Sequence, residues 1–179
     1  MEQEINAVDL DPWLNNCLVG SVDGTVSYVQ LATKKKLWSQ KIHGGTIVAL
    51  AINTDGTYAL TASADGSINY LYLRTGNILF TIKTSSNESI KQMAINPRGT
   101  YAVIGRAHTW EYINLHTGAV IHTLYSAQEI EQIGLNNEHM YIMKNDFLKI
   151  KYFDIIDDRI KQITPELLMA QRNIGSYLP

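Results

Sequence analysis

The chain has 179 residues, of which 45% are hydrophobic and 18% are charged, with 15 Lys and Arg against 17 Asp and Glu. This composition excludes a disordered tail, because such tails combine low hydrophobicity with high net charge. It also argues against a general DNA or RNA binder, which normally carries a basic face. The single cysteine, Cys17, excludes an intrachain disulfide and a cysteine-based zinc site.

Neither a membrane span nor a signal peptide is evident. The longest uncharged apolar run, residues 47–52, is far too short to cross a bilayer. The first 15 residues carry four acidic side chains and lack a basic segment. We therefore expect a cytoplasmic protein without membrane insertion, or a periplasmic one if an N-terminal signal has been removed.

Internal repeats run through the chain with a period of 42 or 43 residues. Residues 51–59 and 94–102 are nearly identical and lie 43 positions apart. Further markers recur every 42 positions: Asp-Gly at 23–24 and 65–66, Thr-Gly at 75–76 and 117–118, and Tyr28, Tyr70 and Tyr112. Four units fit this period: about 4–43, 46–87, 88–128 and 129–164.

Each unit is expected to form four short strands, and the second unit shows this most clearly. Its first segment, 47–52, is apolar throughout, which is typical of a strand buried on both faces. Turn signals then separate the further strands 58–63, 67–73 and 78–82. Four strands in about 40 residues form one blade of a β-propeller. We predict an all-β fold with four four-stranded blades in residues 1–164.

The second unit resembles a WD repeat. The resemblance rests on His43-Gly44-Gly45, Ile47, 51–53, Asp55-Gly56, 60–63 and Asp65-Gly66. WD repeats end their third strand with Trp-Asp, where this chain has Leu71-Tyr72 and, in the first unit, Val29-Gln30. The stretch from Asp23 to Trp38 instead is similar to quinoprotein-type propeller repeats. The chain is identified as a divergent WD-like propeller.

The resemblance also assigns structural roles. In WD repeats, a His before the inner strand, a Ser or Thr of the second strand and the turn Asp form hydrogen bonds within the blade. His43, Ser63 and Asp65 match these positions. The same residues, with Ser21 and Asp23, could also be combined on paper into a Ser-His-Asp triad. We favour the structural interpretation and predict no catalytic residue.

No cofactor or metal is predicted either. His108, His116 and His122 fall in the third unit, but the strand prediction separates the first two by about 20 Å. One ion with ligands about 2 Å away cannot be shared over that distance. A quinoprotein-like or other propeller enzyme remains the alternative. It is disfavoured because the inner strands offer no carboxylate cluster.

Two positions are candidates for binding a partner protein. Where the first two units have Asp-Gly before the third strand, the third has Arg106-Ala107-His108 and is one residue shorter. Either the turn is relaxed, or Arg106 and His108 recognise a partner on the face formed by residues 43–46, 64–66, 84–89, 106–108 and 126–129. Trp13, in the first turn of the chain, either packs on its blade or anchors an interface.

Residues 165–179 break the repeat. Thr164, Pro165 and Glu166 favour a helix start, and Gly175 favours a stop, so a short helix is predicted at 165–173. Its Leu167 and Leu168 either cover a strand edge or dock on a partner.

Four blades are few for this repeat, and three arrangements are open. The chain is a fragment of a larger propeller, or it pairs with a copy or another chain, or it closes as a four-bladed ring. Exposed blade faces would be apolar, so we expect a homo-oligomer or a larger complex. The predicted function is a non-catalytic protein-interaction scaffold. A nucleic-acid-associated scaffold is a second alternative, whose support is the run Lys34-Lys35-Lys36.

Overall fold

The computed structural model describes residues 4–83, 88–126, 130–135, 139–144, 150–156 and 159–163. The helix predicted at 165–173, with Leu167 and Leu168, lies outside the described residues, so that prediction stays open. Among the described residues no helix occurs.

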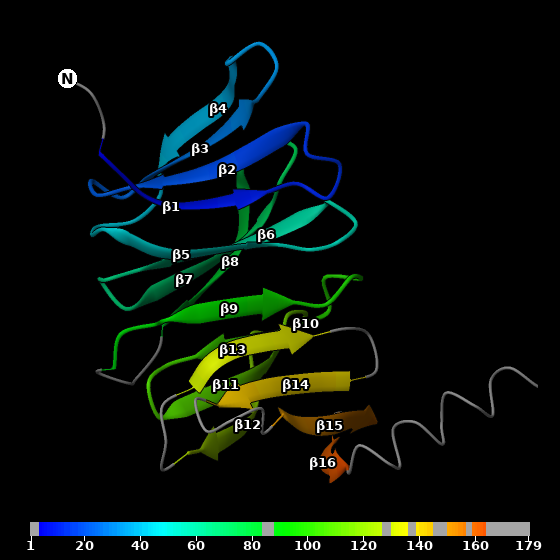
Figure 1. The fold of residues 1–179 in the computed structure, drawn as a ribbon. Coiled ribbons are helices and arrows are strands. Elements are labelled where there is room, and N and C mark those ends of the chain that lie inside the picture. The colour runs from blue at the N-terminus through cyan, green and yellow to red at the C-terminus, as the bar shows by residue number, and fades with distance from the viewer. Residues whose placement is uncertain are drawn as a thin grey trace, which may run out of the picture.

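Sixteen strands form four antiparallel sheets, and each sheet takes four consecutive strands in chain order (Figure 1). The strands of the first two sheets are β1 (Ile5–Leu10), β2 (Asn16–Ser21), β3 (Thr25–Gln30), β4 (Lys36–Lys41), β5 (Ile47–Ile52), β6 (Tyr58–Ser63), β7 (Ser67–Tyr72) and β8 (Asn77–Lys83). Those of the last two are β9 (Gln92–Ile95), β10 (Tyr101–Gly105), β11 (Thr109–Asn114), β12 (Val120–Tyr125), β13 (Ile130–Leu135), β14 (His139–Lys144), β15 (Ile150–Ile156) and β16 (Arg159–Ile163). The prediction of an all-β fold with four four-stranded blades is confirmed.

The blades stack one after another in chain order. Figure 1 shows the inner strands β1, β5, β9 and β13 following each other down the molecule, with the first and last blades at opposite ends. The described strands therefore form an open stack, and the alternative of a closed four-bladed ring is wrong.

The turns between strands use glycine as the sequence indicates. Gly56 and Gly66, each after an aspartate, have φ of 61° and 83°. Side chains other than hydrogen rarely adopt this left-handed conformation, so Asp-Gly reverses the chain at little cost. The repeat of Asp-Gly in the sequence is thus a repeat of tight turns.

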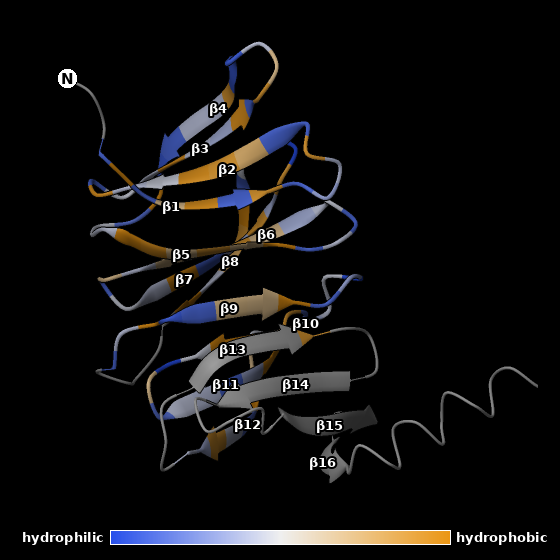
Figure 2. Cartoon of the chain, in the orientation of Figure 1, coloured by the Kyte–Doolittle hydropathy of each residue, from blue (hydrophilic) through white to orange (hydrophobic). Residues whose placement is uncertain are grey.

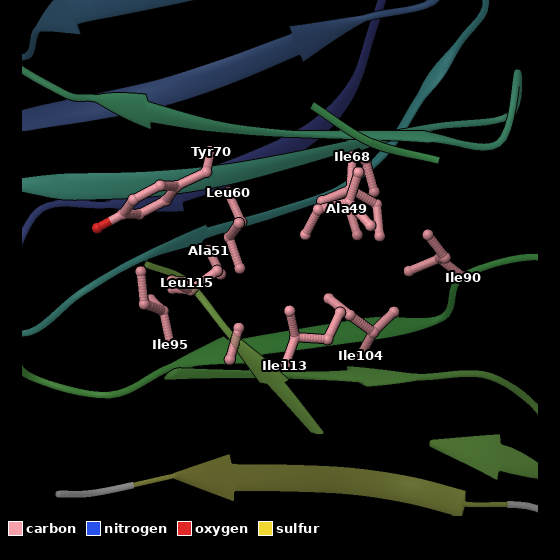
Figure 3. Packing of buried hydrophobic residues seen from close by; sticks show 13 residues of the cluster. Ala49, Ala51, Leu60, Ile68, Tyr70, Ile90, Ile95, Ile104, Ile113 and Leu115 are labelled. Carbon is pink, nitrogen blue, oxygen red and sulfur yellow. The ribbon is translucent and has the colours of Figure 1, made fainter. Parts of the chain in front are cut away.

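The core lies between blades rather than within one. One cluster joins the second and third blades through small and branched residues such as Ala49, Leu60, Ile104 and Ile113 (Figure 3). Another joins the first and second blades through Leu18, Val26, Ile47, Ala59, Leu71 and Leu73. Figure 2 shows the same division, with hydrophobic residues on β2 and β5 and hydrophilic ones on the outer strand β4.

The three repeated tyrosines occupy this core. Tyr28 is 7% exposed, Tyr70 5% and Tyr112 0%. The Tyr70 hydroxyl donates a hydrogen bond of 2.7 Å to the Gly99 carbonyl in the first turn of the next blade. The Tyr28 hydroxyl bonds Asp11 Oδ2 at 3.3 Å within its own blade. The tyrosines are inter-blade core residues, as the sequence predicts, and Tyr70 also ties two blades by a polar contact.

The substitution Tyr70→Phe removes that contact while leaving the ring. Because the Gly99 carbonyl loses a buried donor, we expect a loss of about 1 kcal/mol in the free energy of unfolding. Urea denaturation of the variant measures it. Tyr72→Phe is the matched control in the same sheet, and its effect should stay within about 0.5 kcal/mol. Equal effects of the two substitutions would contradict the role of the inter-blade bond.

Candidate functional site

The connections between strands gather at two opposite ends of the blades. In an up-and-down sheet, the turn between the second and third strands and the link to the next blade lie at one end. This end, called the loop face here, carries residues 43–46, 64–66 and 106–108, together with 88, 89 and 126 of the predicted segments. Trp13 and the lysines 34–36 lie in turns at the other end, so the predicted site residues do not form one surface.

A chain of polar side chains supports the loop face in the second blade. His43, which is 5% exposed, contacts the hydroxyl of Ser67 through Nδ1 at 2.6 Å and that of Thr61 through Nε2 at 2.8 Å. The Ser67 hydroxyl donates to Asp65 Oδ1 at 2.5 Å. Ser67 must therefore accept from Nδ1–H, and neutral His43 accepts at Nε2 from Thr61. A nearly continuous line of hydrogen bonds thus runs from Asp65 to the blade interior.

Asp65 also holds the link between blades. Its Oδ2 accepts a hydrogen bond of 2.7 Å from the Gly44 backbone, and its Oδ1 accepts one of 2.9 Å from the Ser67 backbone. Partial burial raises the pKa of Asp65, but these bonds and the Ser67 hydroxyl outweigh it and lower the pKa to about 2. The carboxylate is thus ionised at neutral pH and pins the loop from the first blade to the turn of the second.

For His43, in contrast to Asp65, burial has the larger effect on the pKa. Burial lowers the pKa of His43 from its usual value, and the attraction of Asp65, whose Oδ1 lies 4.0 Å from Nδ1, offsets this in part. His43 is therefore neutral in the folded protein near pH 7. Both ring nitrogens of His43 thus contact hydroxyl groups of its own blade, those of Ser67 and Thr61.

His43, Ser63 and Asp65 all make hydrogen bonds within the blade, as the structural interpretation predicts. The hydroxyl that meets the imidazole is that of Thr61, not Ser63. Ser63 instead accepts a 3.2 Å hydrogen bond from the Asp65 backbone. Thr61 and Ser63 lie two residues apart and so share the face towards the first blade, but Thr61 is the one paired with Asn69, beside the His43 ring.

Arg106 is the main departure from the sequence-based expectation. Its side chain is fully buried, at 0% exposure, and its Nη1 donates to Glu111 Oε2 at 2.9 Å. Its backbone N–H closes a tight turn on the Thr109 carbonyl at 2.7 Å. The expectation that Arg106 offers its guanidinium at the surface of a loop is wrong.

The strand register explains why an arginine is buried there. Counting from the repeated tyrosines, Glu111 takes the position of Asn69, Ile104 that of Thr61 and Arg106 that of Ser63. The sequence has no histidine between His43 and His108, so the third blade lacks the imidazole that Asn69 and Thr61 surround in the second. An ion pair between Arg106 and Glu111 takes the place of the histidine network.

The other predicted residues are exposed and stand apart. His108 lies at the surface of the loop face, where its carbonyl accepts a 2.8 Å bond from the Ser126 backbone. Trp13 is 61% exposed, although its ring covers Gly56 in the first turn of the second blade. His116 and His122 are exposed as well. His108 and Trp13 stay candidates for partner binding.

Within the described part of the chain, no group of three or more His, Cys, Asp or Glu side chains is placed to hold a metal ion. Over the same residues, no helix is long and apolar enough to cross a membrane.

The substitution Arg106→Ala tests the buried ion pair. Because it leaves the Glu111 carboxylate, 14% exposed, without its partner, we expect a loss of about 3 kcal/mol in unfolding free energy. Thermal or urea denaturation measures the loss. The double change Arg106→Met with Glu111→Leu should recover much of it, and Arg98→Ala, an exposed arginine of the same blade, should cost less than about 0.5 kcal/mol. A stability of Arg106→Ala close to wild type would contradict the structural role.

The pH dependence of stability tests the histidine network. The unfolded chain binds a proton at His43 below about pH 6.5, whereas the folded chain, with its lowered pKa, does not. The contribution of His43 to the free energy of unfolding should therefore be fully present above about pH 6.5. It should fall as the pH drops from there towards the pKa of His43 in the folded protein. Urea midpoints at pH 7.5 and 5.5 measure this slope, which His43→Gln should reduce. The control His122→Gln should keep it.

Comparisons with known proteins agree with this geometry. The family model described as WD domain, G-beta repeat matches residues 34–70, which span β4 to β7 and include His43, Thr61 and Asp65. The chain is 27% identical over 143 residues to a striatin homolog of Dictyostelium discoideum, covering 71% of this chain and 17% of that protein.

A solved structure, titled as that of U3-55K, shares the fold. It superposes with a TM-score of 0.72 at 12% sequence identity, over 91% of this chain and 52% of that chain. The chain thus spans about half of that structure and less than a fifth of the striatin homolog. The chain thus contains a match to the WD repeat at residues 34–70, and its four blades share the β-propeller fold and are similar to WD-repeat proteins.

Proposed function

We propose that this chain is a non-catalytic, cytoplasmic protein-interaction scaffold that works inside a multiprotein assembly. We further propose that the outward face of its first blade packs against a propeller blade of a second copy of this chain. The observation that carries the proposal is the apolar character of that face.

Residues opposite each other on neighbouring strands share a face of the sheet. In the first blade, one row contains Leu18, Tyr28 and Trp38, which pack against the second blade. The rows that include Val8 and Leu10 therefore point away from it. Val8 is 56% exposed and Leu10 is 47% exposed.

The second blade shows what these positions do when covered. One repeat of 42 residues along, Leu10, Cys17, Val29 and Leu31 correspond to Ile52, Ala59, Leu71 and Leu73. All four of the latter belong to the cluster between the first and second blades, and Ala59, Leu71 and Leu73 are fully buried. The first blade thus has interface-type residues on its outward face, but no described blade of this chain covers that face. Apolar sheet faces of this kind mark interaction sites in soluble proteins.

The loop face supplies a second surface for partners. Its backbone is held rigidly by Asp65 and by the buried Arg106, while His108 stands exposed at its surface. Binding residues are commonly loop residues on a rigid scaffold. A scaffold role is supported further by the likeness to WD-repeat proteins.

The solution mass tests the assembly. We expect light scattering to give a mass above the 20.1 kDa of one chain. Val8→Lys combined with Leu10→Lys should reduce this mass without lowering the melting temperature, because a charge at an apolar interface is costly only when it is buried. Val120→Lys, which places the same charge on an exposed residue of β12, should keep the assembly. A stable monomer of the unchanged chain would refute the proposal.

A further inference from the structure

The outer strand of the second blade is an unprotected sheet edge. In the sheet order β5-β6-β7-β8, strand β8 comes last, and no described strand pairs with its outer side. An edge strand presents unpaired N–H and C=O groups, and natural proteins usually blunt such edges with charges, especially lysine. Strand β4, the equivalent edge of the first blade, begins with Lys36 and ends with Lys41. Strand β8 has no charged residue before Lys83, and Ile78 and Leu79 are 42% and 49% exposed.

A groove of about 510 Å³ runs beside this edge. It is lined by Leu79, Phe80, Thr81 and Ile82 of β8 and by the turn His116–Gly118 of the third blade. This volume falls within the range of about 300–1,000 Å³ that is usual for clefts that hold ligands. An unpaired edge and a groove of mixed lining, with Leu79, Phe80 and Ile82 as its apolar part, thus occur side by side on the rim.

The first blade shows how the same place is closed. Trp38 occupies the repeat position of Phe80, 42 residues earlier. Its indole N–H donates to the Leu73 carbonyl at 2.8 Å, and its ring lies against Gly76 in the turn of the second blade. Phe80 is smaller and has no ring N–H, and it lies farther from the equivalent Gly118 than Trp38 lies from Gly76.

We propose that the rim of the second blade binds an extended peptide segment of a partner protein, which adds to β8 as a fifth strand and places an apolar side chain in the groove. The inference rests on the proposed scaffold function and gives it a specific site. Main-chain hydrogen bonds to the edge supply affinity in this mode, and pockets for alternate side chains supply specificity. The uncharged stretch from Asn77 to Ile82 favours an uncharged, apolar segment over an acidic or basic one.

Two substitutions that copy residues of the first blade into β8, called graft variants here, should close the site. Ile78→Lys restores the lysine that stands at position 36, and Phe80→Trp restores the ring that stands at position 38. The matched control is Val120→Lys, the same charge at the equivalent position of the third blade, where Val120 is 45% exposed. Melting curves by circular dichroism verify that all three variants fold, and Ile78→Lys, on an exposed residue, keeps the test valid if Phe80→Trp fails.

The probe is a phage-displayed library of random 12-residue peptides selected on the unchanged chain. We expect enriched peptides to be uncharged and apolar at alternating positions. By fluorescence polarisation they should bind at least tenfold more weakly to each graft variant and unchanged to Val120→Lys. Methylation of alternate backbone nitrogens of the peptide should abolish binding, because the main chain supplies the bonds.

Peptides that bind the graft variants as well as the unchanged chain would overturn the proposal, as would a selection that enriches none. So would a dimer of the unchanged chain that dissociates in both graft variants, because it would assign the edge to a second copy. The two proposals fail separately. If the graft variants lose peptide binding but the unchanged chain is a monomer, only the blade-pairing proposal is refuted. If the chain assembles through Val8 and Leu10 but no peptide distinguishes the graft variants from the unchanged chain, only the rim site is refuted.

Discussion

Packing between blades is the constraint on which this structure depends. The second and third sheets are apolar on both faces and each contributes to two clusters between blades, so neither can bury its core by itself. The small residues of β5, such as Ala49 and Ala51, let neighbouring inner strands approach closely. Burial of apolar surface at about 25 cal/mol per Å² is the main favourable term, which makes stability a property of neighbouring pairs of blades.

Polar groups at the ends of the blades hold the connecting loops in place. The second blade uses a neutral histidine, hydroxyl groups and the ionised Asp65, whereas the third uses the ion pair of Arg106 with Glu111. Both networks occupy the same register on the face towards the preceding blade. A buried ion pair requires a close partner because an isolated charge is costly in the interior. The third blade thus reaches the same result with different chemistry.

The surfaces left over by this packing are where a scaffold can act. The outer face of the first blade repeats the residues of a blade interface, and the rim at β8 has Ile78 and Phe80 where β4 has Lys36 and Trp38. The two surfaces differ in kind, since one is a sheet face suited to another sheet and the other is a strand edge suited to a single extended segment. Both arise from departures between otherwise similar repeats.

Local patterns in the sequence determined the strands, the turns and the repeat. These signals are the alternation of side chains, Asp-Gly at positions that need positive φ and tyrosines every 42 residues. The structural roles of His43 and Asp65 were implied by the resemblance of the second unit to a WD repeat. The tertiary structure decided what depends on contacts between distant residues. It buried Arg106 beside Glu111, placed the Thr61 hydroxyl against His43 and left the groove beside Phe80, because each outcome depends on which side chains of neighbouring strands and blades meet.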